Sequence, residues 1–133
     1  MIFLDSSFLI SFEVANDSNH ERAVSIMRNV VKGVYGTAVI SNFIFDETVT
    51  VTFARTNLSN AISAGEGMKA SYAMEIVEEK IFNDAWDLFK NQKNTELSFI
   101  DCTSVILLQE RGIKNIATFD QDFKKIKGIN AIS

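Results

Sequence analysis

Apolar residues recur along this chain in two alternating patterns. Short runs with few polar interruptions, such as Met1–Leu4, are typical of buried strands. Longer stretches, of which Asn19–Val31 and Lys80–Asn91 are the clearest, carry apolar residues three and four positions apart, a spacing that predicts amphipathic helices. Because the two patterns alternate from one end of the chain to the other, the sequence predicts a parallel three-layer α/β/α sandwich.

The same patterns give approximate bounds for each element. Strands are expected at Met1–Leu4, Gly36–Ile40, Ala73–Val77, Asn115–Phe119 and Ile129–Ile132. Helices are expected at Ser6–Ala15, Asn19–Val31, Asn42–Arg55, Lys80–Asn91, Asp101–Gly112 and Asp122–Ile126. Asn57–Ser71, which contains Gly65 and Gly67, is expected to hold a short helix and a loop. The inner side of the helix up to Arg55 is expected to carry Phe43, Val51 and Ala54.

No stretch of the sequence resembles a linker or an internal repeat. The chain has no proline, six glycines and no like-charge tract. With 133 residues, 47% of them apolar, it is large enough to bury a core of its own. We therefore expect one domain spanning residues 1–133.

Composition sets limits on the setting and on the binding partners. The 13 basic and 17 acidic side chains give a net charge of −4, which argues against a bulk electrostatic grip on nucleic acid but leaves a cation-assisted one open. The single cysteine, Cys102, excludes an internal disulfide, favours a reducing compartment and is expected in the core. No apolar run reaches the roughly 18 residues of a membrane span, and the first residues lack the basic region of a signal peptide. We expect a soluble, cytoplasmic protein.

Several kinds of catalytic site are excluded. The only histidine, His20, lies in the polar start of an expected helix, so two-histidine mechanisms and zinc clusters of the usual Cys/His spacing cannot be assembled. The motifs G-x-S-x-G, G-x-G-x-x-G and G-x-x-x-x-G-K-[ST] are absent. Any chemistry must therefore use carboxylates.

Four acids are expected at one edge of the sheet. Asp5 and Asp120 each follow an expected strand directly, and the carboxyl ends of parallel strands form the edge where such sheets bind ligands. Ser98 and Asp101 have the spacing of a helix capping box, which places Asp101 in a first helical turn. Glu47 lies about two turns into a helix among apolar neighbours, where an unpaired carboxylate is costly. Capping alone also favours acids at helix starts, so position by itself leaves a purely structural role open.

Four converging carboxylates repel one another at pH 7 unless they bind protons or cations. Ligands made only of oxygen suit Mg²⁺ or Mn²⁺. Such ions activate water and stabilise the charge that develops on a phosphodiester. The pattern therefore favours metal-assisted phosphodiester chemistry.

Four segments together resemble the PIN-domain family, in particular its small VapC-like toxins: MIFLDSSFLI, SNFIFDETVT, LSFIDC and ATFDQDF. The resemblance covers the whole chain. It implies a five-stranded parallel sheet of order 3-2-1-4-5 and a divalent-metal-dependent endoribonuclease. It assigns the four catalytic and metal-binding positions to Asp5, Glu47, Asp101 and Asp120. VapC-like proteins typically form homodimers and are held inactive by a small antitoxin.

The resemblance also implies supporting roles around these acids. Ser7 stands where the family often has a small polar residue, and Thr118 where a hydroxyl often supports the site. Asp122 is either a further acid of the site or a helix cap ahead of the core residue Phe123.

Other residues are candidates for contacts with partners. An apolar trough for an antitoxin helix is expected at Phe8, Leu9 and Phe12. RNA phosphates near the site are expected to meet Arg22, Arg55 and Lys69, with solvated surface charge as the alternative.

Two alternatives to a nuclease remain open at this point. The first is a regulatory domain that binds Mg²⁺ for phosphoacceptance, which would have paired acids near the first strand. The second is a nuclease-like fold that binds RNA or protein without catalysis.

Overall fold

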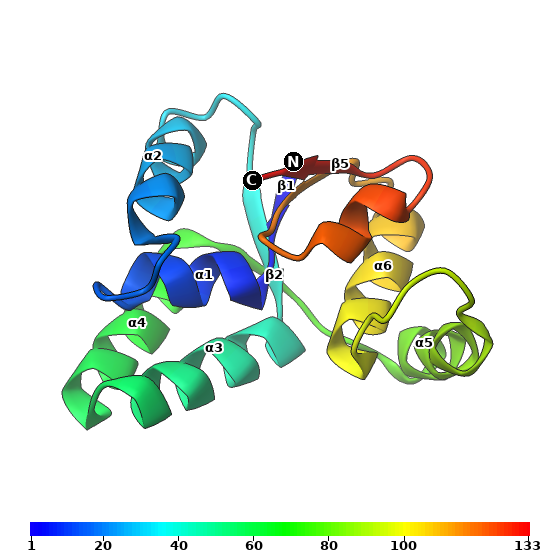
Figure 1. The fold of residues 1–133 in the computed structure, drawn as a ribbon, viewed down its shortest axis with the longest axis horizontal. Helices are drawn as coiled ribbons and strands as arrows, with labels where there is room; N and C mark the ends of the chain where they lie inside the picture. Colours follow the sequence, from blue (N-terminus) through cyan, green and yellow to red (C-terminus); the bar gives the residue numbers. More distant parts are fainter.

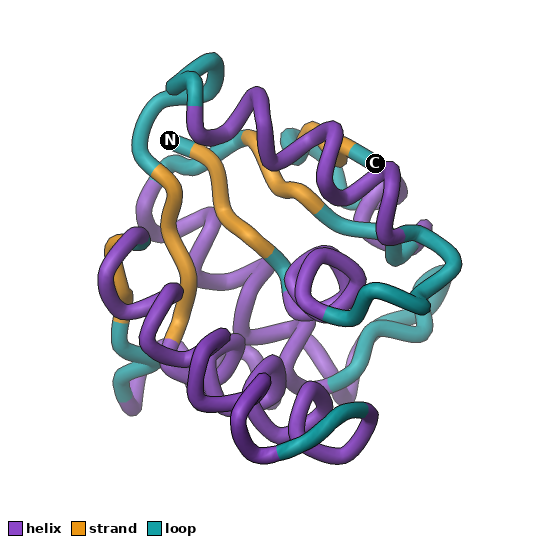
Figure 2. The backbone as a smooth tube through the Cα atoms, turned by 90° about the vertical axis from the view of Figure 1, so that its left-hand side faces the viewer, coloured by secondary structure: helices purple, strands orange, loops and turns teal.

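The computed structural model describes all 133 residues, and its five strands form one parallel sheet in the order β3-β2-β1-β4-β5. The strands are β1 (Ile2–Leu4), β2 (Ala38–Ser41), β3 (Ala73–Glu75), β4 (Asn115–Ala117) and β5 (Asn130–Ile132). Figure 2 shows them side by side, and β1, at the centre, pairs with β2 and β4. The expected strand number, direction and order are confirmed.

Helices cover both faces of this sheet. They are α1 (Ser6–Glu13), α2 (His20–Val31), α3 (Asn42–Arg55), α4 (Leu58–Ser71), α5 (Glu79–Asn91), α6 (Phe99–Arg111) and the short 3-10 helix η1 (Gln121–Lys125). In Figure 1, α1 to α4 lie to the left of the sheet and α5 and α6 to the right, which confirms the expected three layers. None of the helices is both long and apolar enough to cross a membrane.

The core is centred on β1, whose three residues are fully buried because helices cover both faces of the central strand. Phe8 and Leu9 of α1 also belong to this core and have no exposed surface, while Phe12 is half-buried. Phe8 and Leu9 therefore do not line the expected apolar trough, because α1 turns them onto the sheet, whereas Phe12 lines an apolar hollow together with Met27 and Val31 of α2. Cys102 is buried in the core, as expected.

Helix α4 is the main departure from the expected elements. It is one continuous helix that includes Gly65 and Gly67, where a short helix and a loop were expected. Gly65 is buried against α3, where an added Cβ would lie 3.4 Å from Val49 Cγ2 and 3.5 Å from Phe45 Cζ. This close packing of α4 on α3 offsets the low helix propensity of glycine, which costs about 1 kcal/mol per residue.

The inner side of α3 also differs from expectation. Ala54 is exposed, whereas Ile44, Thr48 and Thr52 are fully buried. These three residues are four positions apart and form one stripe along the helix. Because two of the three residues of this stripe are polar threonines, the spacing of apolar residues in the sequence did not predict it.

Candidate active site

The first turns of α1, α3 and α6 come together at one end of the sheet, below β1 and β2 in Figure 1. All four predicted acids line one cavity of about 320 Å³ there. Its lining comprises Asp5, Ser6, Ser7, Ile10, Glu47, Ser98, Asp101 and Asp120. The fold thus brings together acids that are up to 115 positions apart in the sequence.

Asp5 is the most buried of the four acids, with 1% of its surface exposed. Its Oδ2 accepts hydrogen bonds from Ser7 Oγ at 2.6 Å and from Thr118 Oγ1 at 2.8 Å. Its Oδ1 is buried without any hydrogen-bond partner. Burial, reinforced by the nearby charge of Asp101, raises the pKa of Asp5 to about 6, although the two hydroxyls oppose the shift.

The two hydroxyls also hold the chain that follows β4. Ser7 Oγ accepts from the Phe119 amide at 3.0 Å, and Thr118 Oγ1 accepts from the Asp120 amide at 3.0 Å. Because these amides bond to side chains, β4 ends at Ala117, and Asp120 lies three residues beyond the strand instead of directly after it. The predicted supporting residues thus fix Asp5 and Asp120 relative to each other.

Asp101 lies in the capping box that the sequence predicts. Its amide donates to Ser98 Oγ at 3.1 Å, and its Oδ2 accepts from the Ser98 amide at 2.9 Å. Partial burial raises the pKa of Asp101, and the charges of Asp120 and Glu47 act in the same direction. The cap fixes the carboxylate at the start of α6 and leaves Oδ1 without a protein hydrogen bond.

Glu47 reaches the cavity from α3 and is half-buried, while Asp46 beside it is exposed. The Glu47 carboxylate forms no hydrogen bond or ion pair within the chain, and Asp120 uses only Oδ1, which accepts from the Asp122 amide at 2.8 Å. Each of the four acids therefore keeps at least one oxygen that no protein donor occupies.

Asp122 does not line this cavity. Its carboxylate accepts hydrogen bonds from Lys125 Nζ and from the Glu96 amide, the latter at 2.8 Å, and these two hydrogen bonds hold the pKa of Asp122 below its usual range. Asp122 therefore ties η1 to the segment before α6, and the residue that caps η1 is Asp120.

The acids suit a hard divalent cation, although they do not form a tight ligand group. No three His, Cys, Asp or Glu side chains are close enough to be a ready-made metal site. The oxygens without partners, above all the buried Asp5 Oδ1, are the ligand type that such cations take. The residues present therefore fit a cation that would sit among them.

A second cavity, of about 360 Å³, adjoins the first and shares Ser7, Ile10 and Asp120 with it. Arg55 lines it, and Arg22 lies over the ring of another lining residue, Phe119, with 5.2 Å between guanidinium carbon and ring centroid. Of the three predicted phosphate contacts, Arg55 thus lines the cavity that adjoins the acidic one, and Arg22 lies at its rim. The part played by Phe119 carried no signal in the sequence.

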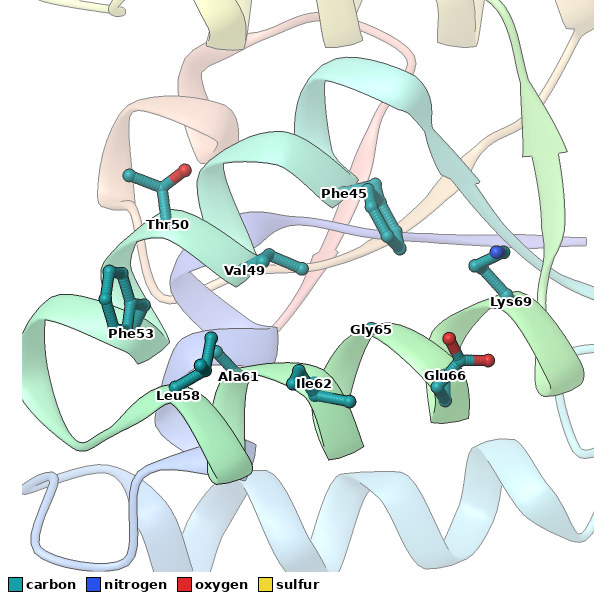
Figure 3. Close-up of a pocket in the computed structure, with 10 residues that line it drawn as sticks. All are labelled: Phe45, Val49, Thr50, Phe53, Leu58, Ala61, Ile62, Gly65, Glu66 and Lys69. Carbon is teal, nitrogen blue, oxygen red and sulfur yellow. The ribbon is translucent and has the colours of Figure 1, made fainter.

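Lys69, the third predicted phosphate contact, lies elsewhere. It lines an apolar groove between α3 and α4, shown in Figure 3. The groove contains none of the four acids, and its exposed residues include Phe53, Leu58 and Ile62. Lys69 is therefore not placed to contact a phosphate bound at the acids.

Residues 2–129 match the model of the PIN domain. The chain belongs to the PIN-domain family. It is 29% identical over 124 residues to the 23S rRNA-specific endonuclease VapC20 of Mycobacterium tuberculosis, in strains CDC 1551 / Oshkosh and H37Rv, and the alignment covers 92% of each chain. The crystal structure of M. tuberculosis VapC20, a Sarcin-Ricin loop cleaving toxin, has a TM-score of 0.83 and 26% identity, with 94% of both chains covered.

Membership of the family confirms the resemblance found in the sequence. PIN-domain nucleases generally depend on divalent metal ions. The oxygen-only character of the cavity in this PIN domain is consistent with that chemistry.

Proposed function

We propose that this PIN domain is a metal-dependent endoribonuclease that hydrolyses RNA phosphodiester bonds, and that it is the toxin of a toxin–antitoxin pair. The observation that carries the proposal is the cavity lined by four acids from four parts of the chain. The similarity to an rRNA endonuclease over 92% of both chains supports it.

Asp5, Glu47, Asp101 and Asp120 are the proposed catalytic residues, and they would hold Mg²⁺ or Mn²⁺. When bound, such an ion supplies activation of water and stabilisation of charge on the phosphodiester. Ser7 and Thr118 hold the Asp5 carboxylate with Oδ1 free to serve as a ligand. A cavity of about 320 Å³ has room for water besides an ion, and Mg²⁺ usually keeps several of its waters.

The proposed substrate is a structured RNA loop. VapC20 is described as 23S rRNA-specific and as cleaving the Sarcin-Ricin loop. Loops expose unpaired bases that a protein surface can hold, whereas paired RNA hides them in a narrow groove. We propose a ribosomal RNA loop for this chain as well, and therefore action in the cytoplasm.

The test is cleavage of a Sarcin-Ricin loop oligoribonucleotide by the purified protein with Mg²⁺ or Mn²⁺. We expect cleavage that a chelator abolishes and that Asp101→Asn lowers at least 100-fold in kcat. The matched control is Asp46→Asn, at an exposed acid outside the cavity, which keeps wild-type activity. Cleavage that survives both the chelator and Asp101→Asn would show that the acids are not the catalytic site. Metal binding without cleavage of any RNA would favour a metal-binding regulatory module instead.

We also propose a homodimer, supported by an exposed aromatic face on α5. Phe82, Trp86 and Phe89 are 44%, 47% and 37% exposed, and Trp86 stacks on Phe89. Aromatic side chains are enriched at such interfaces. We expect sedimentation equilibrium to show a dimer that Phe89→Glu dissociates and that Ile62→Glu, on α4, leaves intact. A wild-type monomer would contradict the proposal.

The proposed antitoxin is a small protein encoded by an adjacent reading frame. The apolar groove between α3 and α4 offers it a docking site, since Phe53, Leu58 and Ile62 are all more than half exposed there. We expect Ile62→Glu to weaken antitoxin binding in calorimetry while Phe89→Glu preserves it. Equal affinity of both variants for the antitoxin would place its docking site elsewhere.

A further inference from the structure

The cavity beside the acids continues the candidate active site. It shares Ser7, Ile10 and Asp120 with the acidic cavity, so the two cavities adjoin at these three residues. An RNA strand whose phosphate lies at the acids therefore has its next nucleotide within reach of this second cavity. The inference below rests on the proposed RNA cleavage and concerns how the substrate is held.

Arg22 brings an unpaired positive charge to the rim of the second cavity, because it does not line the cavity itself but contacts two residues that do, Asn19 and Phe119. Its guanidinium is exposed and forms no ion pair, and its one hydrogen bond is to Asn19 Oδ1 at 3.5 Å. By contrast, Arg55 is paired with Asp17 at 2.8 Å, and Lys125 is paired with Asp122. Both of those cations are already balanced by a carboxylate, whereas the charge of Arg22 is free to meet a phosphate.

Phe119 keeps Arg22 at this position. The guanidinium carbon is 5.2 Å from the ring centroid, which is within the range of a cation–π contact. The ring is itself supported by Phe8 of the buried core, with 6.1 Å between centroids. The Phe119 amide is also bound to Ser7 Oγ, so the ring is fixed relative to the acidic cavity.

We propose that the second cavity is a nucleotide subsite next to the scissile phosphate. Arg22 offers its charge to a neighbouring phosphate and its planar guanidinium to an unpaired base, since bases of single-stranded RNA stack on both arginine and aromatic groups. Phe119 is a positioning residue that acts by holding Arg22. The Asp17–Arg55 pair forms the wall of the subsite, between the α1–α2 loop and α3.

The test measures four variants: Arg22→Ala, Arg22→Lys, Phe119→Leu and the double variant that combines Arg22→Ala with Phe119→Leu. The matched control is Arg28→Ala. Arg28 is an exposed arginine on the same helix that lines a different hollow, beside Phe12 and Val31. Binding of a fluorescein-labelled oligoribonucleotide is measured by anisotropy in a chelator at several salt concentrations. The values of kcat and KM are measured with Mn²⁺, and thermal unfolding checks that each variant folds.

We expect Arg22→Ala to weaken RNA binding about 10-fold and to lower the salt slope by about one, because one phosphate contact is lost. Arg22→Lys keeps the slope and recovers part of the affinity. Phe119→Leu weakens binding but has no further effect in the Arg22→Ala background, because it acts through Arg22. In all of these variants KM rises while kcat is kept, and Arg28→Ala behaves as wild type.

The outcomes separate this inference from the proposed function. If the wild type cleaves RNA and Arg22→Ala matches Arg28→Ala in affinity, slope and KM, the subsite is overturned and the nuclease stands. If no RNA is cleaved but Arg22→Ala weakens binding as described, the subsite stands and the proposed catalysis fails. Additive losses from Arg22→Ala and Phe119→Leu would overturn the positioning role of Phe119.

Discussion

Asp5 shows at the scale of one residue how the site is prepared for a positive charge. One carboxylate oxygen is held by two hydroxyls, and the other is buried with no partner at all. A buried, unpaired charge is unfavourable, so without a cation the group is stabilised by binding a proton. The raised pKa of Asp5, about 6, expresses that preference.

This preference predicts a pH dependence of stability. The folded-state pKa of Asp5 lies above its usual 3.8, so between pH 4 and pH 6 the folded protein binds more protons than the unfolded one. The contribution of Asp5 to the free energy of unfolding therefore falls by about 3 kcal/mol as the pH rises through that window. Urea unfolding in a chelator, for wild type and Asp5→Asn, isolates this contribution. A difference between the two proteins that stays constant with pH would contradict it.

The sequence predicted the acids of the site better than their surroundings. Asp5, Glu47 and Asp101 are where a buried strand, an apolar helix and a capping box put them, because local patterns determine these positions. Asp122, like Asp101, lies at the start of a predicted helix, but it does not line the acidic cavity. Its carboxylate is bound instead to Lys125 and to the Glu96 amide. Such partners depend on tertiary packing, which a local pattern does not contain.

At the scale of elements, the sequence predicted where a helix begins and ends better than it predicted whether a helix continues without a break. Helix α6 begins at its capping box and ends at Gly112, which has a φ of +64°. Both signals depend only on neighbouring residues. The continuity of α4 through Gly65 depends instead on its packing against α3, which the sequence pattern does not show.

Two glycine substitutions are expected to have opposite effects on stability. Gly67 lies inside α4, is exposed and has no atoms within 4 Å of an added Cβ, so Gly67→Ala raises the free energy of unfolding by about 0.5–1 kcal/mol. Gly112 also has open space, but its left-handed backbone disfavours a side chain, so Gly112→Ala lowers it by about 1 kcal/mol. Chemical denaturation measures both values. A stabilising Gly112→Ala would contradict the role of backbone conformation at the end of α6.

At the scale of the whole molecule, an acidic protein has to act on an acidic polymer. The net charge is −4, and four of the acids face one cavity. Cations reduce the repulsion of RNA by this region, and the two that no carboxylate of the chain already balances are the proposed metal ion and Arg22. The order of the strands in the sheet makes it possible for these acids to face one cavity. That strand order was predicted because the resemblance to the PIN-domain family covers the whole chain.

Metal binding is expected to stabilise the folded protein in a pH-dependent way. At pH 8, well above the pKa of Asp5, a cation at 100 times its Kd raises the free energy of unfolding by about 2.7 kcal/mol. At pH 5 the gain is smaller, because a proton already occupies Asp5, whose pKa is about 6. Thermal unfolding with and without Mn²⁺ measures the effect, and Asp101→Asn reduces it. The same increase in Tm for wild type and Asp101→Asn would place the bound metal outside the cavity.

Because β1 pairs with β4, the surroundings of Asp5 are complete only after β4 has been translated. Asp5 is translated 113 residues before Thr118, whose hydroxyl holds it, and β1 gains its β4 neighbour only when that later segment has been made. While the chain is still being translated, the first acid has neither the hydroxyl that orients it nor Asp120 beside it. A nascent chain that has not yet reached β4 therefore lacks the complete acidic site, so it cannot use that site to cleave RNA.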